Sequence, residues 1–390
     1  MVDPFVGVVI YLDSNATAPS DPQVVAAMQP FFSDCFANPS SNYRAGRQVH
    51  AVVEQARHQV AALLNAVPDE ILFTSGGTES NNAAIESAIM FWPQRRHLVI
   101  GATEHPAVAE PAQRWLRRGG EVTVIPVNCR GLIDLEALRQ AIRPDTVLVS
   151  IMWANNETGV LAPMAEIVEI AHTAGALVHS DAVQAVGKVC VDLREVPVDF
   201  LSLSAHKIHG PKGMGALYVS RRVRFEPLLL GGGQEGGRRS GTENVPGIVG
   251  LGMAAELMQP PHLAFVRELR DAFERRVITA TGAVMNGDPQ QRLGNTSSLC
   301  FTGLDAAGLL ILLDEKGVCC SAGSACHSAS LHPSQVLAAM GFDAAHAAST
   351  LRFSFSRFNT MPEVLQAAGL VIEAVAKLRD LSAGGPVMIN

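Results

Sequence analysis

The sequence predicts an α/β fold in which a mostly parallel seven-stranded sheet is flanked by helices and is followed by a smaller α/β unit. Seven short apolar runs lie between residues 71 and 219, and they alternate with amphipathic stretches of helical periodicity. Strands that alternate with helices are joined by right-handed crossovers, which give a mostly parallel sheet covered on both faces. Beyond a glycine-rich stretch near residue 230, the pattern changes to longer helices and fewer strands, which indicates a second unit.

The expected elements follow the chain in order. A first helix at 45–64 carries valine, leucine and alanine on one face. The seven expected strands are residues 71–74, 97–101, 121–127, 146–152, 176–180, 199–204 and 215–219, with helices among them at 134–142 and 163–174. The stretch LLLGGGQEGGRRSGTENVPG leaves no room for regular structure. After it we expect a long helix at about 247–281, strands around 298–302 and 317–321, and a closing helix at about 362–379.

These elements predict two domains. We expect residues 16–258 to form the large domain, and residues 1–15 and 259–390 to form the small one. The small domain contains the segment SAGSACHSAS, which has almost no apolar surface to bury. We therefore expect a mobile loop at about 321–333, with Cys326 as its thiol.

Composition excludes several classes of protein. The chain has 390 residues, of which 48% are hydrophobic and 17% charged, as in globular proteins with a sizeable core. A net charge of −7 gives no support for nucleic-acid binding, and no apolar run is long enough to span a membrane. The N-terminus lacks the basic region of a signal peptide, and the seven cysteines show no disulfide spacing. We expect a cytoplasmic protein.

Polar clusters follow five of the expected strands. In open α/β sheets the ligand binds at the carboxyl ends of the strands, so these clusters predict one common site. Their members are Ser75 to Thr78, Glu104 and His105, Asn155 to Glu157, Asp181 and Gln184, and Ser204 to Lys207.

The first cluster lies in FTSGGTESNNAAI, where small residues end a strand and open a helix. Unpaired N–H groups at a helix start bind phosphate, and the helix dipole strengthens that binding. Taken alone, such turns are common, and an ordinary N-cap by Thr78 or Ser75 is the favoured interpretation.

Two later clusters carry charged side chains. A buried carboxylate such as Asp181 requires a partner, which a protonated ring nitrogen would provide, although a helix cap is equally consistent with its position. In LSLSAHKIHGPKG, Lys207 stands among Ser204, His206 and His209. Burial lowers the pKa of a lysine and makes it a nucleophile able to form a Schiff base, while the usual alternative is a lysine that extends into solvent. A phosphate cradle, a carboxylate for a ring nitrogen and a Schiff-base lysine together are typical of pyridoxal-phosphate enzymes.

Nearly the whole chain resembles a known family. The stretches that carry the resemblance are YLDSNATAP, FTSGGTES, ATEHPAV, WANNETG, HSDAVQAVGK, SAHKIHGPKG, GGGQEGGRRSGTENVPGIVG, SAGSACHSAS and LRFSFSRFNT. They are similar to those of the cysteine desulfurases of the nitrogen-fixation and iron–sulfur-cluster types. That family has the class V aminotransferase fold, which is fold-type I among pyridoxal-phosphate enzymes.

The resemblance implies a role for each matching residue. Cofactor binding would fall to Gly77, Thr78, His105, Asn156, Asp181, Gln184, Ser204, His206, Lys207 and Thr242, with Thr242 reaching the phosphate of a second subunit in a homodimer. Gly77, Thr78, Ser204 and His206 would hold the phosphate, and His105 would stack on the ring. Asp181 would pair with the ring nitrogen, and Gln184 would bond the ring hydroxyl. Substrate orientation would fall to Asn156 and Arg352.

The resemblance also implies a reaction. Lys207 would carry pyridoxal phosphate as a Schiff base and move the α-proton of L-cysteine. The thiolate of Cys326 would attack the substrate sulfur and become a persulfide, alanine would leave, and a sulfur-acceptor or scaffold protein of iron–sulfur-cluster or related biosynthesis would take the sulfur. We expect Cys326, Lys207 and His105 to be the catalytic residues, with no metal ion.

Two alternatives stay open at this point. Cys326 is followed by His327, as in animal selenocysteine lyases, so L-selenocysteine is an alternative substrate. His327 is either a solvated loop histidine, which we favour, or a group that lowers the pKa of Cys326. The second alternative is a protein of another class, a non-catalytic sulfur carrier or metal-binding module. The Cys319, Cys320, Cys326 and His327 spacing fits no common zinc site.

Overall fold

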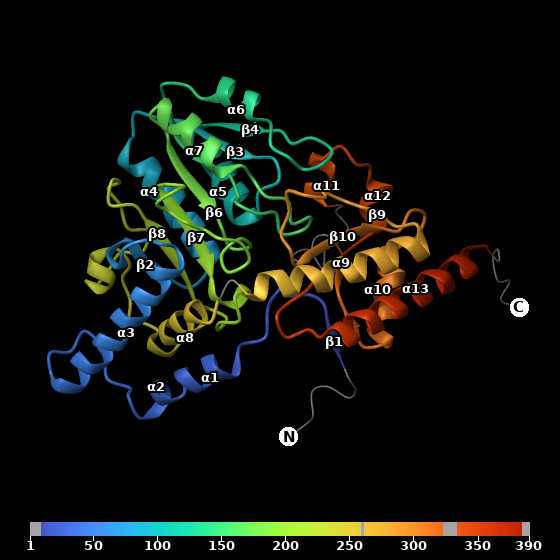
Figure 1. Ribbon diagram of the computed structural model, residues 1–390. Helices are drawn as coiled ribbons and strands as arrows, with labels where there is room; N and C mark the ends of the chain where they lie inside the picture. Colours follow the sequence, from blue (N-terminus) through green and yellow to red (C-terminus); the bar gives the residue numbers. More distant parts are fainter. Residues whose placement is uncertain (1–8, 259–260, 323–333, 384–390) are drawn as a thin grey trace, which may run out of the picture.

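The structure, a computed structural model, describes residues 9–258, 261–322 and 334–383. Its centre is a seven-stranded sheet in the order β2-β8-β7-β6-β5-β3-β4 (Figure 1). The strands are β2 (Ile71–Thr74), β3 (His97–Gly101), β4 (Glu121–Ile125), β5 (Thr146–Ser150), β6 (Leu177–Asp181), β7 (Phe200–Ser204) and β8 (Gly215–Val219). The predicted mostly parallel seven-stranded sheet is confirmed.

The exception to the parallel arrangement is β8, which runs antiparallel to both of its neighbours, β2 and β7. The connection from β7 to β8 spans residues 205–214 and contains only the short 3-10 turn η2 (Ala205–Lys207). A parallel crossover needs a dozen or more residues, so this connection allows only an antiparallel return.

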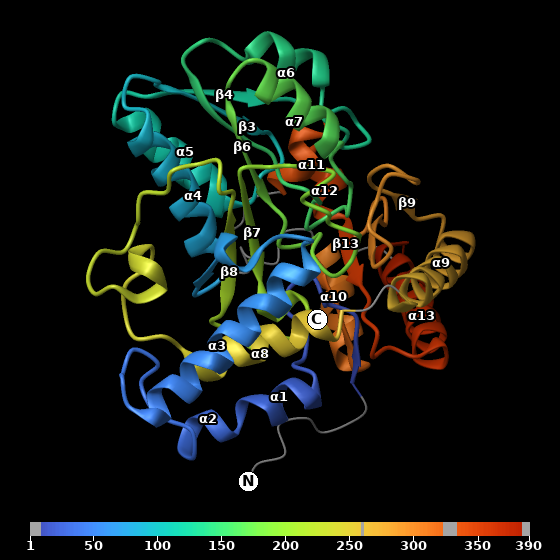
Figure 2. The same cartoon turned by 60° about the vertical axis from the view of Figure 1, so that its left-hand side comes forward.

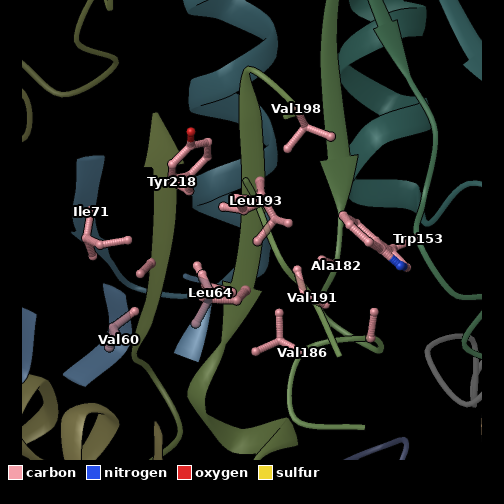
Figure 3. Close-up of a cluster of buried hydrophobic side chains, with 14 of the residues drawn as sticks. Val60, Leu64, Ile71, Trp153, Ala182, Val186, Val191, Leu193, Val198 and Tyr218 are labelled. Atoms are coloured by element: carbon pink, nitrogen blue, oxygen red, sulfur yellow. The ribbon is translucent and has the colours of Figure 1, made fainter. Parts of the chain in front are cut away.

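Helices cover both faces of this sheet because alternate strand residues point to opposite sides. On one face, Phe73 and Val178 belong to a buried cluster with α3 (Arg44–Leu63), α6 (Leu135–Ala141), α7 (Met164–Thr173) and α8 (Val245–Glu256). On the other face, Leu72 and Leu177 pack with α4 (Gly77–Phe91) and α5 (Pro106–Arg117). Figure 3 shows part of the first cluster, which includes Val60, Leu64 and Tyr218. Two short helices, α1 (Pro22–Met28) and α2 (Pro30–Ser33), lie along α8.

A second buried cluster lies around a smaller sheet with the strand order β12-β13-β10-β9. Its strands are β9 (Val284–Met285), β10 (Thr296–Cys300), β12 (Ser321–Ala322) and β13 (Thr350–Ser354), and a separate pair joins β1 (Ile10–Tyr11) to β11 (Val318–Cys319). The accompanying helices are α9 (Pro261–Thr281), α10 (Ala306–Glu315), α11 (Gln335–Ala339), α12 (Ala344–Ala348) and α13 (Met361–Ala383). The first strand of the chain therefore lies among its last elements (Figures 1 and 2).

Two sequence-based expectations are wrong. The long helix expected at about 247–281 is two helices: α8 ends at Glu256, packs on α3, and is followed by α9, which begins at Pro261 and packs on α13. Pro260 and Pro261 follow one another in the sequence, and a proline inside a helix removes a hydrogen bond and clashes with the preceding turn. The glycine-rich stretch, expected to lack regular structure, contains the 3-10 turn η3 (Gln234–Gly237).

Within the described ranges, no helix combines the length and the apolar character needed to cross a membrane.

Candidate active site

A cavity of about 380 Å³ opens at the carboxyl ends of the parallel strands. Residues from all five polar clusters line it, together with Arg352 from β13 and Gln335 and Val336 from α11. The predicted site residues that it brings together are Gly77, Thr78, His105, Asn156, Asp181, Gln184, Ser204, His206, Lys207 and Arg352. The side chains therefore come from the seven-stranded sheet and the four-stranded sheet, and from segments next to them.

One predicted site residue among the described residues, Thr242, does not line this cavity and is exposed on the loop between η3 and α8. Cys326 and His327 lie outside the described residues. So does the expected mobile loop at about 321–333, apart from Ser321 and Ala322, which form the strand β12.

The start of α4 forms one wall. The helix has Gly76 as its N-cap, and no side chain caps it, so the interpretation as an ordinary N-cap by Thr78 or Ser75 is wrong. A Cβ atom on Gly77 would lie 2.6 Å from Cγ2 of Val183, so only glycine fits there without a shift of the neighbouring residue. Backbone N–H groups and the helix dipole favour an anion at this wall.

Asp181 lies buried at the end of β6. Its Oδ2 accepts a hydrogen bond from Nδ2 of Asn81 at 2.6 Å, and its Oδ1 accepts one from the backbone N–H of Val183 at 3.0 Å. Oδ1 of Asn81 is buried and has no partner among the described residues. Sequence reasoning missed Asn81, although it lies four residues after Gly77 and therefore on the same face of α4.

Glu104, beside these residues, is a second buried carboxyl group. Its Oε1 accepts a hydrogen bond from the backbone N–H of Met152 at 2.7 Å, and burial raises its pKa well above the usual value. The charge of Asp181 raises the pKa further. Burial and the neighbouring Asp181 therefore both favour the neutral form of Glu104.

Lys207 ends the turn η2 after β7. Its Nζ donates hydrogen bonds to the backbone carbonyls of Asn15 at 2.5 Å and Ala16 at 2.7 Å. The neighbouring His206 lies with Nδ1 3.1 Å from Oγ1 of Thr17, and burial, with the nearby lysines, lowers its pKa to about 4. The amine of Lys207 is thus held at the cavity by backbone oxygens, next to a neutral histidine.

His105 caps the start of α5. The backbone N–H of Ala107 donates to its Nδ1 at 3.1 Å. Since Nδ1 is the acceptor, the neutral imidazole carries its proton on Nε2.

Asn15 is the residue that sequence reasoning missed most clearly. Its carbonyl accepts from Lys207 and from Nε2 of Gln184, its Nδ2 donates to the carbonyl of Asn156, and its Oδ1 accepts from Nζ of Lys188. The only signal in the sequence was its place in YLDSNATAP, a stretch quoted for the resemblance without a role.

Glu157 lines the cavity beside Asn156. Its Oε2 accepts a hydrogen bond from Oγ of Ser334 at 2.5 Å, the N-cap residue of α11. Burial raises its pKa to about 7, against the opposing effects of Ser334 and Arg352. Glu157 therefore titrates near neutral pH.

The aminotransferase class-V family matches residues 10–366 of this chain. A cysteine desulfurase of Gluconacetobacter diazotrophicus is 49% identical over 383 residues, which are 96% of this chain and 95% of that protein. Among solved structures, a NifS-like protein superposes with a TM-score of 0.89 at 36% identity, covering 95% of this chain and all of the other. A structure of SspA in complex with cysteine superposes with a TM-score of 0.81 at 34% identity, covering 90% of this chain and 99% of the other.

The match extends over most of the chain and includes every strand of the large sheet and the walls of the cavity. The chain belongs to the aminotransferase class-V family.

Proposed function

We propose that the protein is a pyridoxal-phosphate-dependent cysteine desulfurase, which converts L-cysteine to L-alanine and passes the sulfur on for iron–sulfur-cluster or related biosynthesis. The observation that carries the proposal is the cavity, in which Lys207, Asp181 and the uncapped start of α4 face one space. The 49% identical cysteine desulfurase supports the substrate.

The residues present fit pyridoxal phosphate. A phosphate dianion suits the start of α4, where Gly77 leaves room and the helix dipole is favourable. A protonated ring nitrogen suits Asp181, and a carbonyl carbon suits the amine of Lys207. Ser204 and His206 would add phosphate contacts, and His105 would cover the ring. Bound pyridoxal phosphate supplies an electron sink for the carbon next to the amino group.

The protein's own groups then perform the remaining chemistry. Arg352 and Asn156 hold the carboxylate of cysteine, and the orphaned, buried Nε of Arg352 supports an anion there. Lys207 takes the proton from the α-carbon and returns it to the product. The thiolate of Cys326 attacks the substrate sulfur: an S–S bond forms as the C–S bond breaks, and the bonding pair remains with the carbon, which is released in alanine after protonation.

A homodimer is part of the proposal. Thr242 is exposed and does not line the cavity of its own chain, as expected for a residue that contacts the phosphate of a partner subunit. Large apolar side chains are also exposed near α2 and in the glycine-rich stretch, with exposed fractions of 68% for Phe32, 78% for Phe36 and 83% for Leu230. Sedimentation equilibrium should give twice the chain mass, and a monomer would contradict this.

Two further expectations are kept as proposals. The two separate buried clusters support the division at residues 15/16 and 258/259. The six described cysteines are all free thiols, which supports a cytoplasmic location.

The deciding experiment quantifies alanine and the released chalcogenide with cysteine and with selenocysteine as substrates. With a thiol added to reduce the Cys326 persulfide to free thiol and sulfide, we expect alanine and sulfide in equal amounts from cysteine. Cys326→Ala should lose the cysteine reaction, while Cys129→Ala, at an exposed thiol, should keep it. Retained cysteine turnover in Cys326→Ala would contradict the persulfide route. Turnover of selenocysteine alone would indicate the selenocysteine lyase instead.

Colour separates the enzyme from a non-catalytic carrier or metal-binding module. We expect the purified protein to be yellow, and Lys207→Ala to lose the covalent linkage to the cofactor. A colourless protein with stoichiometric zinc would contradict the proposal.

A further inference from the structure

Lys188 is a half-buried lysine that the proposed reaction does not use. It lies four residues after Gln184, and its Nζ donates hydrogen bonds to Oε1 of Gln184 and, at 3.1 Å, to Oδ1 of Asn15. A small cavity of about 60 Å³ adjoins it, and Lys207 lines both this cavity and the substrate cavity.

The surroundings of Lys188 are basic. The ionisable groups that line the small cavity with it are Lys207, His209, His262 and Arg357, and no carboxylate is among its described lining residues. Burial, followed by the charges of Lys207 and Arg352, lowers the pKa of Lys188 well below the usual value for lysine. Desolvating an amine without a counter-ion costs stability, so a contribution to folding does not explain this residue.

The hydrogen bonds of Gln184 give another explanation. A glutamine amide has one oxygen, which only accepts, and one nitrogen, which donates two hydrogen bonds. At one end, Lys188 offers donors to Oε1, and at the other, the carbonyl of Asn15 accepts from Nε2 at 3.0 Å. Both hydrogen bonds require the same orientation of the amide, with Oε1 toward Lys188 and Nε2 toward Asn15. One N–H of Gln184 donates to the carbonyl of Asn15. Because Gln184 lines the substrate cavity, its second N–H is left for a ligand bound there.

We propose that Lys188 is a positioning residue that fixes the amide of Gln184 with an N–H, and not the oxygen, toward the cofactor ring. The inference rests on the proposed function, because the group that receives this N–H is the ring oxygen of pyridoxal phosphate. A flipped amide would bring its oxygen against the carbonyl of Asn15 and against that ring oxygen. Without Lys188, the hydrogen bond to Asn15 is the contact within the chain that still favours this orientation, so the amide is held less firmly.

The test uses the cofactor-loaded protein and follows its visible absorption band as a function of pH. The ring oxygen stabilises the proton on the neighbouring Schiff-base nitrogen. A hydrogen bond donated to that oxygen weakens this effect and so lowers the pKa of the nitrogen. Lys188→Met keeps the length of the side chain but removes the donor. It should therefore raise the pH midpoint of the band by about half a unit to one unit, a shift whose free energy is that of about one hydrogen bond. Pyridoxal phosphate should also bind about three- to tenfold more weakly.

Three comparisons make the result specific. Lys212→Met makes the same change at an exposed lysine near the site and should leave the midpoint at the wild-type value. Lys188→Arg keeps a donor and should stay close to wild type. In a Gln184→Ala background, Lys188→Met should no longer shift the midpoint, because the double-mutant cycle removes the group through which Lys188 acts.

An unchanged midpoint in Lys188→Met would overturn the proposal, as would a shift of equal size in Lys188→Arg or in the Gln184→Ala background. If Lys188→Met does not fold, Lys188→Gln replaces it. This side chain is a weaker donor, and a smaller shift in the same direction is expected, whereas a shift in the opposite direction would overturn the proposal. Failure of the proposed function is distinguishable, because the wild-type protein would then show no visible band.

Discussion

Arg352 and Asp13 form an ion pair at the edge of the candidate site, with Nη2 donating to Oδ1 at 2.8 Å. The other oxygen of Asp13 accepts from Oγ of Ser321 at 2.8 Å, and Nη1 of Arg352 donates to the carbonyl of Asn156 at 3.0 Å. Segments from the beginning, the middle and the end of the chain therefore hold one guanidinium in place. Its Nε has no partner among the described residues, which is consistent with the proposal that Arg352 holds the carboxylate of the substrate.

The first prediction concerns Asp13. Asp13→Asn removes the charge that orients Arg352 but leaves every group that would touch the substrate. We expect the KM for cysteine to rise about tenfold, or about 1.4 kcal/mol, with a smaller change in kcat. Steady-state kinetics measure both values. Ser321→Ala removes only the second partner of Asp13 and should change KM little, and an equal effect of the two variants would argue against orientation by the ion pair.

The second prediction concerns Gly77. Gly77→Ala places a Cβ atom 2.6 Å from Cγ2 of Val183, and overpacking of this kind costs about 1–3 kcal/mol. We expect pyridoxal phosphate to bind at least about tenfold more weakly, measured by fluorescence titration of the apoprotein. Gly77→Ala with Val183→Ala should recover most of the affinity. Gly233→Ala, at a glycine with open space around it and a negative φ, is the control and should have no effect.

The large sheet and most of the cavity were predictable because both follow from local patterns. Each strand is a short apolar run, and the rule for parallel sheets places the residues after the strands at one edge. This is why Gly77, Asp181 and Lys207, which are far apart in sequence, were expected together and are found together.

The contacts that hold these residues were not predictable in the same way. Asn15 meets Lys207 and Lys188 across more than 170 residues, and no periodicity encodes such a pair. The break between α8 and α9 was missed for another reason: the apolar pattern continues through it, and only Pro260 and Pro261 interrupt it. Thr242 does not line the cavity of its own chain, and its expected role came from the resemblance alone.

The third prediction concerns a buried ion pair in the glycine-rich loop. Arg57 donates from Nη1 and Nη2 to the two carboxylate oxygens of Glu235, each at 2.8 Å, and Glu235 also accepts from the backbone N–H of Phe73. Glu235→Gln leaves the Arg57 charge buried without its main partner, which costs about 3–5 kcal/mol of unfolding free energy. Chemical denaturation monitored by circular dichroism measures this loss.

The chain offers a matched control for this pair. Glu54 also contacts Arg57, at 3.1 Å, but its side chain is 37% exposed. Glu54→Gln should therefore cost less than about 1 kcal/mol. Equal losses in the two variants would mean that the buried pair does not anchor the loop.

The fourth prediction concerns the pH dependence of stability at Glu157. Burial raises its folded-state pKa from 4.5 to about 7, so the folded protein binds a proton here that the unfolded chain has already released. Stability from this group is therefore greatest below about pH 4.5 and falls as the pH rises toward 7, by at most about 3 kcal/mol. The loss is complete once the pH exceeds the folded-state value.

Glu157→Gln is neutral at every pH and keeps an oxygen for the hydroxyl of Ser334. Relative to wild type, this variant should gain about 2–3 kcal/mol of unfolding free energy between pH 5 and pH 8. Urea denaturation at four pH values in this range measures the difference, with Glu169→Gln, at an exposed position of α7, as the control that should parallel wild type. Parallel curves for Glu157→Gln and wild type would mean that Glu157 is ionised in the folded protein across the range. A carboxylate facing Arg352 would then compete with the substrate for that guanidinium, and the KM for cysteine would fall in Glu157→Gln.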